Sequence, residues 1–519
     1  MAGKMVLNSP SGADRERSDS ETIEKSNEPI TRLYRYRSVK AVLEQFEELE
    51  RQEIYFSTVD ELNDPMEGFK DLFWSGDEIV WRNFLKHYVY CLLETVYLAF
   101  TMGAEFDRRD VERLVLSTPN SLPDAPIREI YRNLSEAFLV DEAVKVFLAA
   151  VSSRKEPVRR NELMKYMRVL HPLVLNPILQ DLHDRGLWPN MKPLPRGQMK
   201  RSRLSAIKLI QAFALLRSDK EFSKKFSDSV FAVGESAYAE MQLIAEYNLQ
   251  DQNKKSPLVF LGGSYPTAYL AALRKLVHND QYIACFTTRP DNHSMWSSYG
   301  DGHRGVCLVF RTTPNDVGNP CLQINRVVGM GGAKGKEPTY SFNFVRHNLE
   351  PVKYSTSYPA VDFFRSLGSI RQIDMNNFWY MSEGGKFSVC RDAVYSDEET
   401  WRKKYCEIFG ECALYKTPEW AHEEEYRIVA HSFFDMSGED RRKLKYRFED
   451  LAGIVFGART DTESKLEIMR IVDKKCQEFG RSDFEFYEAG YTSEATFHVS
   501  KLSLIKYKPS PKSDDQADC

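Results

Sequence analysis

The side chains with the clearest chemical potential fall into three short clusters, and the first lies near the start of the chain. Arg35 and Arg37 alternate with tyrosines in the run 34–37. In a strand, residues two apart share a face. Two guanidinium groups on one face need acidic partners or a bound anion, because their donor forks match carboxylate and phosphate. The pattern predicts either structural ion pairs at a sheet edge or an anion-binding face.

Further polar groups follow the first cluster within thirty residues. Tyr55 and Ser57 lie in a second run of strand character, and Asn63-Asp64-Pro65 ends a short helical turn that Thr58 and Glu61 would cap. We expect these side chains to line the same site as the arginines.

The second cluster lies between two predicted strands, in the segment 295–305. Trp296, Tyr299 and His303 stand there with three glycines. Such a loop positions aromatic faces and lets the backbone approach a ligand closely. The alternative is a tight connection with a packed tryptophan.

The third cluster is the acidic run that leads into a late strand. If strand geometry already holds, Glu423, Glu425 and Arg427 share a face. Two carboxylates on one face raise each other's proton affinity and can hold a sugar hydroxyl or an incipient cation. The alternative is a solvated acidic edge.

Other chemistry finds little support in the sequence. The nine cysteines form no CxxC pair, so we expect no metal and reduced, intracellular thiols. The segment 329–336 is rich in glycine but lacks phosphate-loop spacing, which favours a flexible loop. No signal peptide or bilayer-length apolar run is apparent, so we expect a cytoplasmic protein with no membrane partner.

The composition and periodicity of the sequence change along the chain, and these changes predict the elements that position the clusters. We predict a disordered tail (1–30), the first part of a core (31–75), a helical insertion (76–275), the second part of the core (276–508) and a loose tail (509–519). The fold class is therefore α+β, with a mixed, mainly antiparallel sheet assembled from the N-terminal and C-terminal segments around a large α-helical insertion. Prolines punctuate the predicted helices, and residues 318–383 show only weak periodicity.

The net charge of −4 conceals a strong local asymmetry. The segment 154–208 holds 13 lysines and arginines against four acids, a charge of +9 that leaves −13 on the rest of the chain. The basic segment predicts a nucleic-acid or acidic protein partner, or docking onto the chain's own acidic core.

The three clusters together resemble the family called domain of unknown function 2971. The matching segments are 34–37, 54–67, 285–287 with 295–305, and 420–427. The resemblance covers about 31–75 and 280–508 and leaves the helical block as an addition. Ser298 and Gly300 stand where the family often has His and Ala. Membership implies no known reaction.

A second resemblance is architectural. The ADP-ribosyltransferase-like superfamily places an arginine on its first strand, a serine or tyrosine on a second and a late glutamate, and Arg35 or Arg37, Ser57 and Glu423-x-Glu425 follow that order. The resemblance implies NAD or a related nucleotide as substrate. A carboxylate would stabilise the oxocarbenium-like centre formed as the nicotinamide–ribose bond breaks, and an arginine would hold the phosphates.

This hypothesis assigns roles to the candidate residues. The catalytic group is Glu425, Glu423 and Ser57. The substrate-binding group is Arg35, Arg37, Tyr55, Asn63, Asp64, Trp296, Tyr299, His303 and Arg427. The competing hypothesis is a non-catalytic binding or regulatory module, in defence or stress response, in which Arg35, Arg37 and Glu425 form a core ion network.

Overall fold

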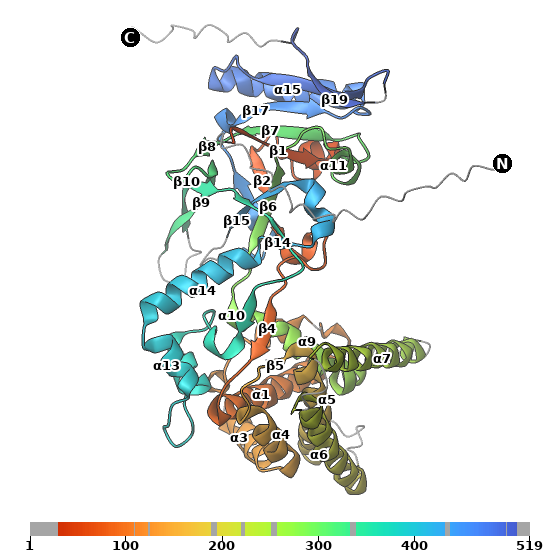
Figure 1. Cartoon of the computed structure of the whole chain (residues 1–519), viewed down its shortest axis with the longest axis vertical. Coiled ribbons are helices and arrows are strands. Elements are labelled where there is room, and N and C mark those ends of the chain that lie inside the picture. The colour runs from red at the N-terminus through yellow and green to blue at the C-terminus, as the bar shows by residue number, and fades with distance from the viewer. Residues whose placement is uncertain are drawn as a thin grey trace, which may run out of the picture.

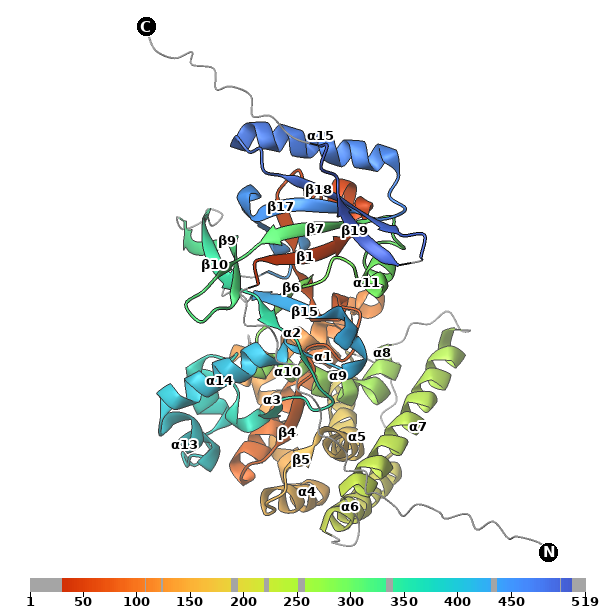
Figure 2. The same cartoon turned by 45° about the horizontal axis from the view of Figure 1, so that its top comes forward.

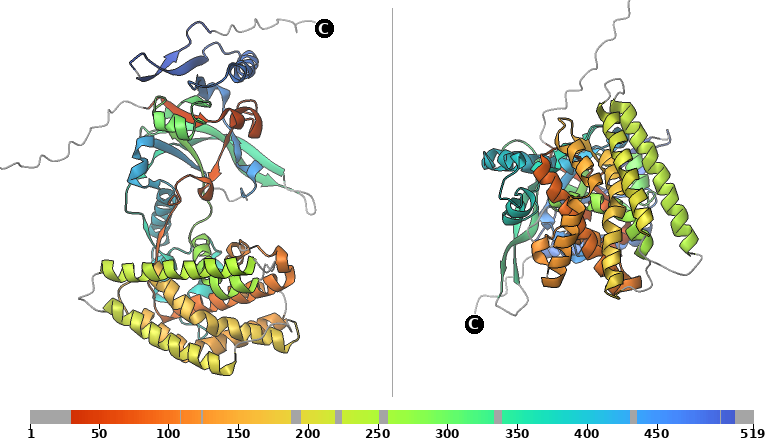
Figure 3. Two further views of the ribbon diagram at one scale, coloured as in Figure 1. Left: turned by 90° about the vertical axis from the view of Figure 1, so that its right-hand side faces the viewer. Right: turned by 90° about the horizontal axis from the view of Figure 1, so that it is seen from below.

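A computed structural model describes residues 30–505, apart from 108, 123–124, 188–194, 219–223, 251–256, 333–338, 431–435 and 495. The two predicted tails and the segment around Lys334 therefore lie outside the described residues. The chain forms a sheet part and a helical part, which lie at opposite ends of the molecule (Figure 1). The segment that leads into β4 (Asp71–Trp74) runs from the first part to the second (Figure 3).

The central sheet is assembled from both ends of the sequence, as predicted. Its strand order is β11-β15-β6-β1-β7-β17-β18-β19, and β3 pairs with β6 beside this path. Every pairing is antiparallel except that of β17 with β18. The strands are β1 (Arg32–Arg37), β3 (Ser57–Thr58), β6 (Tyr282–Thr287), β7 (Val306–Arg311), β11 (Glu350–Pro351), β15 (Glu425–Ala430), β17 (Leu451–Phe456), β18 (Glu485–Tyr491) and β19 (Phe497–Lys501).

Side-chain alternation gives this sheet two different faces. On β1, Leu33 packs into a core with Phe310 and α15 (Thr462–Phe479), which covers one face. Tyr36 lies in a second, smaller core on the other face, where it packs against Trp296 of α11 (His293–Ser298). The two faces decide which candidate residues can meet.

The helical part has its own hydrophobic core around α1, and this core also takes residues from 361–412, outside the predicted insertion. The helices are α1 (Glu78–Met102), α2 (Asp110–Leu114), α3 (Ala125–Leu139), α4 (Glu142–Ser152), α5 (Arg160–Asp184), α6 (Arg196–Ser218), α7 (Lys224–Gln250), α8 (Pro257–Val259), α9 (Tyr265–Ala272), α10 (Arg274–Val277), α12 (Gln372–Asp374), α13 (Val389–Tyr395) and α14 (Glu398–Cys412). The α6–α7 pair stands at the edge of the molecule (Figure 2).

Smaller strands and turns join the two parts. The remaining strands are β2 (Glu53–Tyr55), β5 (Val158–Arg159), β8 (Thr313–Pro314), β9 (Pro320–Gly331), β10 (Thr339–Asn348), β12 (Lys353–Tyr354), β13 (Ala360–Asp362), β14 (Tyr415–Lys416) and β16 (Lys443–Lys445). Short 3-10 or π turns cover 41–45, 59–61, 103–105, 119–121, 260–264, 363–365, 375–379, 418–423, 439–442 and 448–450.

Four local predictions need correction. Pro172 and Pro177 lie inside α5 and do not separate helices. The weakly periodic region contains the long β9–β10 hairpin, including Gly329 to Gly331 of the predicted loop, because its exposed strands carry little alternation. Residues 502–507 have the composition of a late strand, but they follow β19 as a turn up to 505. Thr460 and Glu463 have the spacing of a capping box for α15, but the helix is capped by Asp461.

Candidate functional site: a buried acid–base cluster

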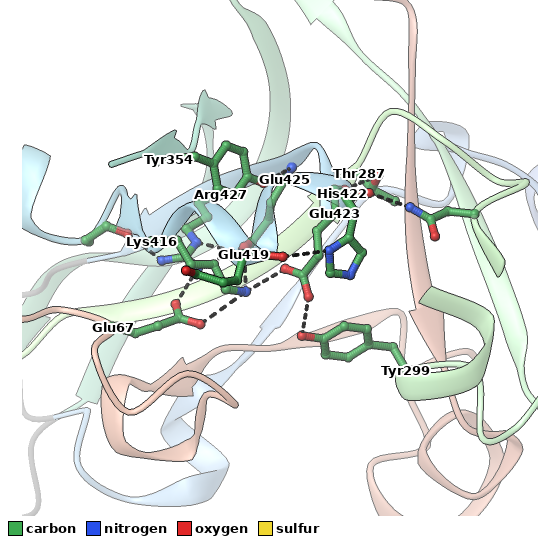
Figure 4. Close-up of polar contacts among 12 residues, drawn as sticks. Glu67, Thr287, Tyr299, Tyr354, Lys416, Glu419, His422, Glu423, Glu425 and Arg427 are labelled. Atoms are coloured by element: carbon green, nitrogen blue, oxygen red, sulfur yellow. Dashed lines mark hydrogen bonds and ion pairs between the residues drawn. The ribbon is translucent and has the colours of Figure 1, made fainter. Parts of the chain in front are cut away.

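The third sequence cluster forms the centre of a network of buried charges beside the central sheet (Figure 4). We call it the acid–base cluster and define it by five residues. They are Glu67, Lys416, Glu423, Glu425 and Arg427, and each is at most 5% exposed.

Lys416, on the two-residue strand β14, is the first cation of the acid–base cluster. Its Nζ lies 2.5 Å from Glu423 and 3.4 Å from both Glu425 and Glu67. Its stem carries this ammonium over the ring of Trp420, 4.5 Å from the centroid. Because three carboxylates surround it, the pKa of Lys416 is raised despite its burial.

Arg427 is the second cation. Its Nε and one terminal nitrogen donate to the two oxygens of Glu425 at 2.8 and 2.9 Å. It also donates to the carbonyl of Ala413 at 2.7 Å and to Glu67. Burial would raise the pKa of Glu425, but Arg427 and Lys416 bring it down to about 2. The predicted mutual rise of two neighbouring carboxylates is therefore wrong for Glu425, because the cations outweigh it.

Backbone geometry brings Glu423 and Glu425 together in an unexpected way. Glu424 adopts a left-handed conformation with φ of 45°, so β15 begins only at Glu425, and Glu423 ends the preceding turn. Both acidic side chains still reach Lys416. The alternative of a solvated acidic edge is wrong, because only Glu424 points to solvent.

Tyr299 of the second sequence cluster and two residues that precede this cluster hold the turn in place. Tyr299 donates to Glu423 at 2.8 Å. Asn292, which caps α11, donates to the carbonyl of His422 at 2.5 Å, and Thr287 of β6 donates to the carbonyl of Glu423 at 2.7 Å. We call the segment 295–305 the aromatic loop, although its first residues belong to α11. The aromatic loop and the acidic run therefore form one structural unit.

The arginines of the first cluster share a face, as predicted, but it is the other face of the sheet. Thr287 pairs with both Glu425 and Tyr34, so these three residues share one face and Arg35 lies on the opposite one. Arg35 donates to the carbonyls of Cys285 and Tyr55, each at 3.0 Å.

Arg37 closes a separate ion pair on that opposite face. It binds Glu48 with two donors at 2.5 and 2.8 Å. Glu48 is thus a structural carboxylate partner for Arg37, which was one of the two alternatives for the first cluster, the other being a bound anion.

The other predicted site residues also lie apart from the acid–base cluster. Ser57 pairs with Ile283, four residues along β6 from the partner of Glu425, which corresponds to about 13 Å. Tyr55 lies against Arg442 and donates to Glu61 at 3.0 Å. The expected single site therefore does not form from these side chains.

Two of the aromatic candidates are packing residues. Trp296 is fully buried and donates to the carbonyl of Pro290 at 2.8 Å. The ring of His303 stacks with that of Trp296 and lies edge-on to that of Phe497. The backbone of His303 has a φ of 69°. A ring buried in this way cannot stack on an incoming nicotinamide, so the packed-tryptophan alternative holds.

Asn63 and Asp64 lie beside the acid–base cluster, not within it. Asp64 is buried, and one of its carboxylate oxygens accepts from the amide of Met66 at 2.9 Å. Asn63 is exposed and lines a cavity of about 400 Å³, which Glu67 borders as well. We call this space the joint cavity, because its walls come from the segment 59–72 and from α5, α9 and α10.

Sequence reasoning missed two members of the acid–base cluster, Lys416 and Glu67. Glu67 belongs to the Asn-Asp-Pro-Met-Glu segment that the family resemblance singled out, and this was an available signal. Lys416 carries no local signal, because it stands alone between a helix and a turn.

The described residues contain no group of three or more His, Cys, Asp or Glu side chains that could hold a metal ion. Glu67, Glu423 and Glu425 face Lys416 and Arg427 instead. None of the described helices has the length and apolarity needed to cross a bilayer.

The basic segment pairs extensively with the chain itself. Arg159 binds Asp71 of β4 at 2.6 Å, Arg203 binds Asp141 at 2.7 Å, and Arg168 binds Glu235 of α7 at 2.8 Å. These contacts fit the alternative of docking onto the chain's own acids. Residues 188–194 of the segment lie outside the described residues.

Residues 295–428 match the model of a family described as "Protein of unknown function (DUF2971)". The match contains the aromatic loop and the acidic run, and it supports the resemblance drawn from the motifs. No curated protein and no solved structure gives a significant match.

Proposed function

We propose that this chain is a non-catalytic binding and regulatory module, in which the acid–base cluster locks the family motifs together. One observation carries the proposal: every carboxylate of the cluster is already bonded to Lys416 or Arg427 in a site closed to solvent. A catalytic carboxylate must reach a substrate, and the side chains of Glu423 and Glu425 are only 2% and 4% exposed. Breaking such a buried pair is costly, which suits a structural role.

ADP-ribosyl transfer would need a different arrangement. An arginine and the late glutamate would have to face one cavity, whereas Arg35 and Glu425 lie on opposite faces of the sheet. NAD as a substrate stays a prediction that rests on the order of residues alone. A nucleic-acid partner also stays a prediction, which rests on the net charge of the segment 154–208; the exposed cations of α6 include Lys200, Arg201 and Lys208.

The proposal is tested by incubating the full-length protein with NAD and measuring nicotinamide release. We expect no release above the protein-free control, with or without added protein or nucleic-acid fractions. Release that is lost in Glu425→Gln but kept in Glu424→Gln would overturn the proposal, provided that both variants are as stable as the wild type. Glu424 is the matched control, because it is adjacent and solvent-exposed.

A further inference from the structure

The joint cavity has the size and position of a small-molecule site. Its volume of about 400 Å³ falls within the usual range of about 300–1,000 Å³, and ligand sites concentrate at the junctions of domains. One wall is the segment that runs from the sheet part to β4, and the other belongs to α5, α9 and α10 of the helical part. A ligand bound there would contact both parts of the molecule.

The lining of the joint cavity is rich in positive charge. Lys70 comes from the sheet side, while Arg160 and Arg274 come from α5 and α10. Within the described part of the chain, Lys70 and Arg160 form no ion pair, and Arg274 reaches Asp60 and Glu112 only at 3.4 and 3.5 Å.

The acids that border the joint cavity do not neutralise these cations. Glu67 is already bonded to Arg427 and lies 3.4 Å from Lys416, within the acid–base cluster. The side chain of Asp60 is 75% exposed, so solvent screens its charge. Two of the three cations therefore lack a carboxylate partner among the described residues.

Crowded cations in a recess are unfavourable unless an anion joins them. Burial lowers the pKa of Lys70 and that of Arg160, and the nearby Arg274 lowers both further. The 25-residue helix α5 begins at Arg160, and no side chain caps it, so the positive end of its dipole lies at this wall. An anion would relieve the repulsion and accept charge-assisted hydrogen bonds.

Apolar side chains form another part of the lining. Pro65, Phe69 and Leu72 stand on the sheet side, and Leu270 faces them from α9. A ligand that fits both the cationic part and the apolar part of the lining has a dianionic end and a flat or apolar end.

We propose that the joint cavity binds a phosphate-bearing small molecule of mononucleotide size, whose phosphate contacts Arg160, Arg274 and Lys70. This inference rests on the proposed function, since a regulatory module needs a site at which a signal enters.

The experiment is titration calorimetry of the full-length protein with AMP, adenosine and inorganic phosphate. We expect AMP to bind, phosphate to bind more weakly because it lacks the apolar end, and adenosine not to bind. Added salt should weaken AMP binding, because screening reduces the attraction. Adenosine binding as tightly as AMP, or no AMP binding at millimolar concentration, would overturn the inference.

The variants Arg160→Gln and Arg274→Gln locate the site. Each should weaken AMP binding by about tenfold or more, the scale of one lost charge-assisted hydrogen bond. The control is Arg201→Gln, an exposed cation on α6 away from the cavity, which should leave affinity unchanged. Unchanged affinity in Arg160→Gln contradicts the inference, and thermal melting verifies that this variant stays folded.

Failure here is distinguishable from failure of the proposed function. If AMP does not bind, the results expected for nicotinamide release and for the stability of the acid–base cluster stay the same. Nicotinamide release that depends on Glu425 would contradict the proposed function, whatever AMP does.

Discussion

At the scale of single residues, the acid–base cluster holds three carboxylates and two cations, so its charges do not balance. Among the described residues, the cations that pair with Glu67, Glu423 and Glu425 are Lys416 and Arg427. Burial raises the pKa of Glu67, and the neighbouring Glu425 raises it further against the effect of Arg427. Of the two carboxylates that share Arg427, Glu67 is therefore the one that gives up its charge more readily.

This asymmetry predicts unequal costs of substitution. Glu67→Gln should lower the free energy of unfolding by less than about 1 kcal/mol, because a neutral amide oxygen still accepts from Arg427. Arg427→Leu should lower it by about 3–5 kcal/mol, because it leaves buried carboxylates without their cation. Urea unfolding measures both, and equal losses would contradict the assignment.

The low pKa of Glu425 predicts a pH dependence of defined sign. A carboxylate whose folded pKa is about 2 contributes stability above its ordinary pKa of 4.5 and loses that contribution as the pH falls toward 2. The difference in unfolding free energy between the wild type and Glu425→Gln should therefore shrink between about pH 4.5 and pH 2. Parallel measurements at several pH values check this, and a difference that stays constant would contradict it.

At the scale of elements, close backbone contacts join the aromatic loop to the sheet. Gly457 follows β17, and a Cβ there would lie 2.3 Å from the carbonyl oxygen of His303. The turn that starts α15 and the loop after α11 can therefore meet only without a side chain at this position.

Gly457→Ala should lower the free energy of unfolding by roughly 1–3 kcal/mol, because backbone atoms must move to admit the methyl group. Gly384→Ala is the matched control, since a Cβ there meets nothing within 4 Å. Thermal melting of the two variants compares them. Equal melting temperatures would mean that the contact is not tight.

The sequence was informative about elements wherever the signal is local. Alternation identified β1, and the pair Thr58 and Glu61 forms the expected capping box. The acid–base cluster could not be predicted in the same way. Glu67 and Arg427 are 360 positions apart, and their contact depends on how the two ends of the chain fold together.

At the scale of the whole molecule, the helical part and the sheet part have separate hydrophobic cores. One core surrounds α1, and two others pack on the two faces of the central sheet. The α+β class and the helical insertion follow from changes in sequence texture. The helices contributed by 361–412 could not be assigned to the insertion, because their partners lie far away in the sequence: Val389 contacts Asp77, and Tyr405 contacts Val277.

Separate cores predict unfolding in more than one step. Scanning calorimetry of the full-length protein should resolve two transitions, and Gly457→Ala should lower only the transition of the sheet part. A single transition that shifts as a whole would show that the two parts unfold as one.

The central claim is that the buried charges of the acid–base cluster hold the fold and perform no chemistry. The most direct test is the free energy of unfolding of Glu425→Gln against Glu424→Gln. We predict a loss of about 3 kcal/mol for the first, because Arg427 loses its two-point partner, and a change within about 0.5 kcal/mol for the second. A Glu425→Gln variant as stable as Glu424→Gln would contradict the account.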